Sequence, residues 1–353
     1  MSAQKTSSET SVSELVQYVQ HKYAYACGRV IDSVILSGMD SQVFDYIIIG
    51  AGAAGLTSAQ YGARSGLNTL VLDTSSPGGQ ALHISCLENY PGLFPAPSGA
   101  QYIENMKQQA LSFGAQITQA KVLSIDKIGS KFSIETSAGS YSCFAVLIAT
   151  GAVHRQLGVP GEKELTGSGV SYCATCDGPF FKDRHIVVVG GGDSACDEAV
   201  YLATLTHHVT LIHRRNTLRA QKAVADRLLA NDHITVRYNE TVRRISGSGR
   251  VESITTFNSL TNEIQILECD AVFIFAGMNP NTELVSTLPT DKAGYIITNE
   301  NMETPVPGLF CAGDVRAKPF RQLVTAAADG ATAAHQAGIY IHNLLQSITG
   351  ALS

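Results

Sequence analysis

Two copies of one sequence pattern constrain the fold of this chain more than any other feature. Each copy is an apolar run that ends in a glycine-rich turn, G-A-G-A-A-G at 50–55 and G-G-G-D-S-A at 190–195. A second apolar run follows each turn, N-T-L-V-L-D at 68–73 and H-V-T-L-I-H at 208–213. A strand, a glycine turn, a helix and a second strand make a βαβ unit of about 30 residues. At 353 residues the chain is long enough to carry two domains.

The likeness between the two halves continues beyond these units. Short alternating runs follow each unit, and each series ends in an apolar run that closes on glycine, V-L-I-A-T-G at 146–151 and V-F-I-F-A-G at 272–277. Alternation predicts half-buried strands, and an unbroken apolar run predicts a strand buried on both faces. One more buried strand is expected at 306–315, followed by a helix over Leu323–Leu345. No third glycine turn accompanies this last segment.

We therefore expect an α/β fold with two Rossmann-like, three-layer dinucleotide-binding domains, the second inserted into the first. The chain should return to the first domain at its last strand, so two connections cross between the domains. Hinges are expected near Gly158–Glu162 and near Asn279–Glu283. The expected boundaries are 43–158 and 283–348 for the first domain and 159–282 for the second.

The first turn has the features of a dinucleotide site without a 2′-phosphate. Gly50, Gly52 and Gly55 let the backbone turn tightly and approach a pyrophosphate, whose charge the helix N-terminus favours. Asp73 ends the second strand, 23 positions after Gly50, where a carboxylate accepts hydrogen bonds from a ribose hydroxyl. A tight turn that binds nothing is the competing interpretation, and the strand, helix and acid together count against it.

The second turn, Gly190-x-Gly192-x-x-Ala195, lacks that acid. Its second strand ends in His213, Arg214 and Arg215, with Arg219 one turn further on. Guanidinium groups hold a 2′-phosphate with charge-assisted, bidentate bonds, whereas a carboxylate would repel it. A solvated basic helix start is the alternative. We expect NADPH on the second domain, and with two dinucleotides in one chain we expect the first to be a flavin, FAD.

The only C-x-x-C of the chain is Cys173–Cys176, followed by Asp177, and it precedes the second unit by about ten residues. Zinc would need two further ligands at workable spacing, and the other six cysteines supply no second pair. A structural disulfide over so short a loop stabilises little. A redox couple fits best, with Asp177 as the acid that supplies or takes the proton. A chance pair, and for Asp177 an ordinary turn residue, remain the alternatives.

Composition bounds the remaining possibilities. A net charge of −5 gives no reason to expect a nucleic-acid partner, and no apolar run approaches the roughly 18 residues of a membrane helix. Residues 1–42 stand apart as an extension, helical or poorly ordered. They lack a basic region before an apolar core and carry Glu9 and Glu14, which argues against a targeting peptide. We expect a cytoplasmic protein with no membrane partner.

These motifs together resemble those of the low-molecular-weight thioredoxin reductases, from about Phe44 to Leu345. Besides both turns and C-A-T-C-D-G, the chain carries P-G-G-Q, E-N-Y-P-G, H-R-R-N-x-x-R-A, P-N-T-E-L and G-L-F-C-A-G-D-V. The resemblance implies a homodimeric thioredoxin-disulfide reductase whose partner is thioredoxin or a thioredoxin-like protein. It also implies that Cys176 faces the flavin, that Cys173 attacks thioredoxin, that Asp177 is the acid, and that the inserted domain rotates.

The resemblance also implies two cofactor sites. The FAD site comprises Gly50, Gly52, Ala53, Gly55, Asp73, Gly78, Gly79, Gln80, Asn89, Thr150, Gly151, Gly313, Asp314, Arg321, Gln322 and Leu323. The NADPH site comprises Gly190, Gly192, Asp193, Ser194, Ala195, His213, Arg214, Arg215 and Arg219.

The chain departs from the family pattern in its extension and at Met278, where an aromatic residue or histidine is frequent. Related readings fit less well. The flavoprotein subunit of a peroxide-reducing system adds an N-terminal module of its own, which 42 residues cannot hold. Ferredoxin reductases of this fold lack the cysteine pair, and dithiol oxidases lack the NADPH arginines. A non-catalytic sensor of NADPH and FAD is the alternative from another class, and it would not oxidise NADPH when given a disulfide.

Overall fold

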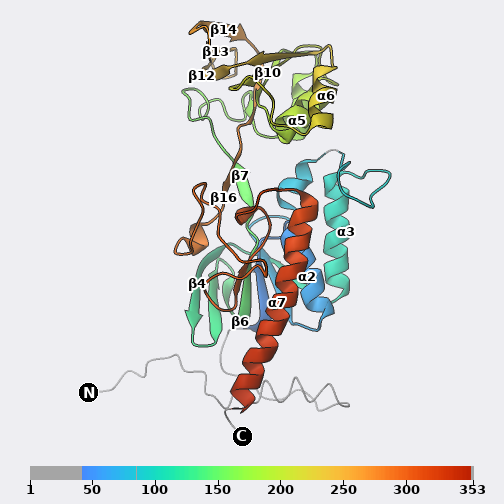
Figure 1. Cartoon of the computed structure of the whole chain (residues 1–353), viewed down its shortest axis with the longest axis vertical. Helices are drawn as coiled ribbons and strands as arrows, with labels where there is room; N and C mark the ends of the chain where they lie inside the picture. Colours follow the sequence, from blue (N-terminus) through green and yellow to red (C-terminus); the bar gives the residue numbers. More distant parts are fainter. Residues whose placement is uncertain (1–41, 85, 351–353) are drawn as a thin grey trace, which may run out of the picture.

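The structure is a computed structural model that describes residues 42–84 and 86–350. The extension expected at 1–42 lies outside these residues except for Gln42, which begins the first strand. Figure 1 shows two lobes that are joined by a narrow two-stranded connection. In the described part of the chain, no helix is long and apolar enough to cross a membrane.

The first lobe is built on a sheet whose strands run in the order β3-β2-β1-β6-β5-β4, with β17 paired to β6. Parallel pairing joins β1 to β2 and β6, and the strands β4, β5 and β6 form an antiparallel meander. The bounds are β1 Gln42–Ile49, β2 Thr69–Asp73, β3 Gln116–Gln119, β4 Val122–Ile128, β5 Lys131–Thr136, β6 Gly139–Ile148 and β17 Leu309–Cys311.

Helices cover one face of this sheet. Residues 53–64 (α2), 99–112 (α3) and 323–350 (α7) pack there on alternate strand residues such as Tyr46 and Ile48, and α7 runs along α2 (Figure 1). The opposite face is covered largely by the segment 283–315, which includes the short helices η4, Glu283–Val285, and η5, Gly313–Val315. Both faces of the sheet are thus buried, as its unbroken apolar strands require.

The second lobe is a smaller version of the same plan. Its parallel sheet has the order β11-β10-β9-β15-β8, and an antiparallel sheet β12-β13-β14 lies beside it. The helices are α4 Ala174–Asp177, η3 Gly178–Phe181, α5 Asp193–Leu202 and α6 Lys222–Leu229. The strands are β8 Val170–Ser171, β9 Ile186–Gly190, β10 Val209–His213, β11 Ile234–Tyr238, β12 Glu240–Ser246, β13 Ser253–Asn258, β14 Ile264–Glu268 and β15 Ala271–Phe275.

The two connections between the lobes lie side by side. Strand β7, Ala152–His154, leaves the first lobe, and β16, Met278–Pro280, returns to it; the two pair antiparallel. Arg155 Nε donates a hydrogen bond of 3.0 Å to Asn279 Oδ1 across the pair. Because β17 rejoins the first sheet beside β6, the α/β fold has the inserted second lobe that the sequence predicts.

The chain beyond β7 is stabilised by one carboxylate. Glu162 is buried and accepts hydrogen bonds from the backbone N–H groups of Leu157 and Gly158, at 2.8 and 2.7 Å. It also accepts one from the Tyr172 hydroxyl, at 2.7 Å. A carboxylate that receives several short hydrogen bonds fixes a turn firmly, so the segment expected as a hinge is an ordered turn next to the paired strands.

Candidate active site

The cysteine pair forms a disulfide, Cys173–Cys176, at the start of the single-turn helix α4. Cys173 is the residue that precedes the helix, and its sulfur accepts a hydrogen bond from the backbone N–H of Cys176 at 3.2 Å. Cys176 is exposed, and Cys173 is half-buried. The pair is thus preformed as an accessible disulfide, which a redox couple needs and a buried structural bridge does not.

The pair belongs to the second lobe but touches the first. The Thr175 hydroxyl donates a hydrogen bond of 2.6 Å to the carbonyl oxygen of His83, and Cys176 Sγ lies 3.2 Å from His83 Nδ1. His83 ends the short helix η2, Gly79–His83, which begins within P-G-G-Q. The segment expected at the flavin therefore meets the cysteine pair. His83 was not among the predicted site residues, because only the folded arrangement of the lobes brings it to the sulfur.

Asp177 lies beside the pair, and its carboxylate is held by another residue. Its Oδ2 accepts a hydrogen bond of 2.6 Å from the hydroxyl of Ser171, a buried residue of β8. The same hydroxyl oxygen accepts a hydrogen bond from the backbone N–H of Cys173 at 3.1 Å. Ser171 therefore fixes Asp177 relative to Cys173, a contact that the sequence did not reveal.

The first glycine turn has the geometry of a phosphate cradle. Gly50 has φ +106°, and a Cβ there would lie 2.3 Å from Ala149 O. A Cβ at Gly55 would lie 1.9 Å from Gly50 O, whereas one at Gly52 would meet nothing within 4 Å. Asp73 closes the site, since its Oδ2 accepts a 2.6 Å hydrogen bond from Ala51 N. The turn thus brings the helix start and the acid together and leaves open space at Gly52.

Substitution at Gly50 should therefore remove the cofactor. The Gly50→Ala variant should purify with at most about a tenth of the FAD, because overpacking costs typically 1–3 kcal/mol and φ is unfavourable for alanine. Gly338→Ala on α7 is the matched control, since its added Cβ meets nothing within 4 Å. The ratio of flavin to protein absorbance measures the outcome, and full FAD content in Gly50→Ala would contradict this account of the turn.

The residues expected at the flavin end converge from four segments. Gln80 Nε2 donates to Ala152 O at 3.4 Å, and Asn89 Nδ2 donates to Gln322 Oε1 at 3.1 Å. The Thr150 hydroxyl donates a 2.6 Å hydrogen bond to the carbonyl oxygen of Asn281. The structure therefore places P-G-G-Q, E-N-Y-P-G and the start of α7 around the base of the connection between the lobes.

Two buried polar atoms in this region have no hydrogen-bond partner within the described chain, Asp314 Oδ1 and Arg321 Nε. The Lys318 ammonium lies 3.4 Å from Asp314 Oδ1, yet burial still raises the pKa of this carboxyl group. The Arg321 guanidinium stacks at 3.6 Å on the Tyr295 ring. Buried polar atoms without partners are costly, so a bound group with hydrogen-bonding capacity, such as FAD, fits these residues.

The second glycine turn differs in its basic surroundings. A Cβ at Gly191 would lie 2.2 Å from the ring of His213, which is buried beneath the turn. Burial lowers the pKa of His213, whose Nε2 lies 2.9 Å from Thr217 O. The buried imidazole ring packs directly against the backbone of the turn at Gly191. Asp193 at the start of α5 accepts two hydrogen bonds from Gln221, at 2.6 and 2.9 Å.

Three arginines surround the end of β10. Arg214, Arg215 and Arg219 are exposed, and their guanidinium groups form no ion pair or side-chain hydrogen bond with residues 42–84 or 86–350. The backbone N–H of Arg219 donates a 2.6 Å hydrogen bond to Gly191 O, which places its Cα beside the turn. Three guanidinium groups that have no side-chain partner in the described chain, next to a dinucleotide turn, can bind an additional phosphate.

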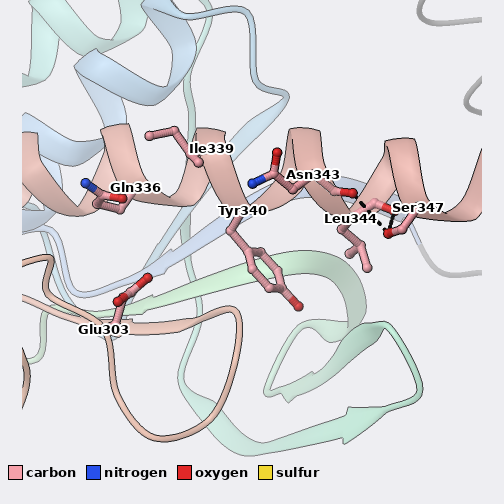
Figure 2. A pocket seen from close by; sticks show the side chains of 7 residues that line it. All are labelled: Glu303, Gln336, Ile339, Tyr340, Asn343, Leu344 and Ser347. Atoms are coloured by element: carbon pink, nitrogen blue, oxygen red, sulfur yellow. Dashed lines mark hydrogen bonds between the residues drawn. The ribbon is translucent and has the colours of Figure 1, made fainter.

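Figure 2 shows a surface pocket on the far part of α7, away from the connection between the lobes. It contains no cysteine, histidine or arginine, and its one acidic group is Glu303. The redox chemistry is therefore not expected there. Its lining residues are Glu303, Gln336, Ile339, Tyr340, Asn343, Leu344 and Ser347.

Residues 44–335 match a family model described as pyridine nucleotide-disulphide oxidoreductase. Over 301 residues the chain is 54% identical to the thioredoxin reductase of Treponema pallidum (strain Nichols). The matched region covers 85% of this chain and 98% of that protein. The chain belongs to the thioredoxin reductases of this family. A solved thioredoxin reductase from Lactococcus lactis, described as being in the FR conformation, is 40% identical. It superposes with a TM-score of 0.83 over 85% of this chain and 99% of its own.

A second thioredoxin reductase structure, from Streptococcus pyogenes, is similar in sequence but superposes less well. It is 42% identical and covers the same 85% of this chain and 99% of its own, yet its TM-score is 0.58. Two family members with nearly equal identity and equal coverage thus differ strongly in how well one rigid superposition fits them.

Proposed function

We propose that this thioredoxin reductase carries electrons from NADPH through FAD to the Cys173–Cys176 disulfide and from there to thioredoxin. When bound, the flavin supplies the disulfide with two electrons and one proton. The observation that carries the proposal is the exposed disulfide seated against η2, the helix that begins within P-G-G-Q. The protein's own residues hold the cofactors, orient the two sulfurs and manage their protons.

The proposed roles follow from chemistry and position. Cys173 attacks the disulfide of thioredoxin, and Cys176 closes the bridge again and releases the product. Asp177, held by Ser171, exchanges the proton of the attacking thiol. The turn at 50–55 would hold FAD in the first lobe, and the cofactor's polar groups would supply hydrogen bonds to Asp314 Oδ1 and Arg321 Nε, two buried atoms without a hydrogen-bond partner in the described chain.

We propose NADPH rather than NADH as the reductant, with the 2′-phosphate on Arg214, Arg215 and Arg219. In the double variant Arg214→Gln/Arg215→Gln, the ratio of kcat/KM for NADPH to that for NADH should fall at least about tenfold. The reason is that a charged hydrogen bond contributes roughly 1.5–3 kcal/mol. Steady-state reduction of thioredoxin with each nucleotide measures kcat/KM, and KM for NADPH should change most. Lys222→Gln is the matched control, since it removes an exposed cation that is paired with Asp226.

The unmodified protein provides the test of the function itself in the same assay. Reduction of thioredoxin with NADPH, strongly preferred over NADH, is the expected result. Equal use of the two nucleotides would contradict the arginine assignment. NADPH binding without transfer of electrons to any disulfide would instead identify a sensor.

We further propose that the two lobes rotate relative to each other during turnover. The domains are proposed at 43–158 with 283–348, and at 159–282. The cysteine pair and the NADPH turn both belong to the inserted lobe, and both must reach one flavin. The difference in TM-score between two family members of nearly equal sequence identity, 0.83 and 0.58, supports a variable arrangement of the lobes. The paired strands β7 and β16 are the elements about which such a rotation would occur.

A homodimer is proposed from the family resemblance. Sedimentation velocity of the full chain measures the assembly directly, and a monomer at assay concentration would exclude the dimer as a requirement for turnover.

A further inference from the structure

We infer that His83 is a further catalytic residue of the dithiol–disulfide couple, and that its imidazolium holds Cys176 as a thiolate once the disulfide is reduced. The inference rests on the proposed function, because it concerns the sulfur that closes the bridge again. It adds a residue from the first lobe to chemistry that is otherwise confined to the second.

The geometry places the ring on the sulfur. His83 Nδ1 lies 3.2 Å from Cys176 Sγ, and a His83 ring nitrogen and both sulfurs lie within 4.8 Å of one another. The contact is supported by the backbone, because the Thr175 hydroxyl donates a 2.6 Å hydrogen bond to His83 O. The same hydroxyl lies 3.5 Å from Cys173 Sγ. One residue of the redox loop thus fixes the segment that presents the imidazole.

Other charged groups near this contact are engaged elsewhere. The Asp177 carboxylate accepts its hydrogen bond from Ser171. Glu88, which follows η2, is paired with Arg227 of α6, and Arg227 also binds Asp197 of α5. His154 on β7 is bonded to Gln80, and burial and then the charge of His83 lower the pKa of His154. Within the described chain, His83 is the titratable side chain that contacts a sulfur of the pair.

The proton balance of the reaction requires a proton donor beside Cys176, and His83 can be that donor. Breaking the S–S bond with two electrons and one proton yields one thiol and one thiolate. An imidazolium N–H that donates to Cys176 Sγ stabilises that thiolate. Thioredoxin must receive two protons in all, so one comes from the thiol and the second from His83. After Cys173 attacks thioredoxin, the Cys176 thiolate attacks Cys173 Sγ and displaces the thioredoxin sulfur, which takes the proton of His83. The imidazole then regains a proton from solvent water before the next turnover.

The reactivity of Cys176 tests this directly, without turnover. The background is the FAD-loaded full chain with Cys173→Ser and Cys86→Ser, so that Cys176 has no bridging partner and the exposed free thiol at Cys86 is absent. Alkylation of the Cys176 peptide by iodoacetamide is followed by mass spectrometry as a function of pH. With His83 present, the midpoint should lie about one unit or more below the ordinary thiol value, because a neighbouring opposite charge shifts a pKa by that amount.

Three variants separate charge from structure. His83→Gln should raise the midpoint to the ordinary thiol value, and His83→Lys should keep it low because it restores a positive charge. His342→Gln replaces an exposed histidine of α7; it is the matched histidine control and should change nothing. Flavin absorbance and circular dichroism verify that each variant is folded.

The outcomes are decisive in either direction. An ordinary midpoint in the parent background overturns the inference even if a His83 variant fails to fold. An unchanged midpoint in His83→Gln overturns it as well, as does a raised midpoint in both His83→Gln and His83→Lys. The proposed function fails by a different result, which is thioredoxin reduction that persists when Cys173 is replaced by serine.

Discussion

Replacing either cysteine of the pair with serine should abolish thioredoxin reduction, with a loss of at least about a thousandfold, because residues that act as one unit fail together. The residues proposed for the FAD site do not include the pair, so Cys173→Ser and Cys176→Ser should both purify yellow and should still be bleached by NADPH. Anaerobic flavin reduction and steady-state thioredoxin reduction, measured on the same preparations, separate the two halves of the reaction.

Cys86→Ser is the matched control for this experiment. Cys86 is an exposed free cysteine only three positions from His83, and it belongs to no disulfide. Its variant should keep the thioredoxin activity of the parent protein. Near-normal activity in either serine variant of the pair would show that another group reduces thioredoxin. Loss of FAD from both variants would assign the disulfide a structural role instead.

The sequence was most informative where local chemistry and fold coincide. Glycines are required at Gly50 and Gly55 because neighbouring backbone oxygens leave no room for a Cβ, so the pattern of small residues predicts the turn itself. Asp73 ends a strand that must lie beside the first one, and the structure places its carboxylate on the glycine turn. The chain's return to the first sheet at β17 could be predicted because an apolar run without its own glycine turn must pair with an existing sheet.

Contacts that depend on the placement of one lobe against the other could not be predicted. His83 lies in a segment expected to bind flavin, and nothing in its neighbours indicates a sulfur 93 positions away in the chain. The bond between Ser171 and Asp177 depends on how the redox loop leaves β8. The pairing of β7 with β16 likewise brings together two segments far apart in the sequence, and the sequence predicted only hinges near Gly158–Glu162 and Asn279–Glu283 in this part of the chain.

One of the polar contacts between the lobes is a surface ion pair that is weak enough to permit movement. Arg227 and Glu88 form an ion pair at 3.0 Å across the lobes, with side chains that are 43% and 58% exposed. Exposed ion pairs of this kind contribute about 0–1 kcal/mol. Such a contact biases one arrangement and does not prevent another, which is what the proposed rotation needs.

A covalent link at this position should therefore stop turnover. In a Cys86→Ser background, Glu88→Cys and Arg227→Cys place two thiols where the ion pair was, and a short bismaleimide with a cleavable spacer joins them while the native disulfide protects the active cysteines. Thioredoxin reduction should fall by at least about a hundredfold, because moving a reacting group by as little as an ångström can cost that much. Cleaving the spacer and removing the reagent should restore the activity.

Rapid mixing with NADPH then shows which half of the cycle the linked arrangement permits. If the link holds the cysteine pair at the flavin, bleaching of the flavin by NADPH should be very slow. If it holds the nicotinamide there, bleaching should be fast while thioredoxin remains oxidised. Each single cysteine variant, treated with the same reagent, controls for modification without linkage. Full turnover in a protein whose link is verified as closed by mass spectrometry would refute the rotation, because the cysteine pair and the nicotinamide could then not have exchanged places at the flavin.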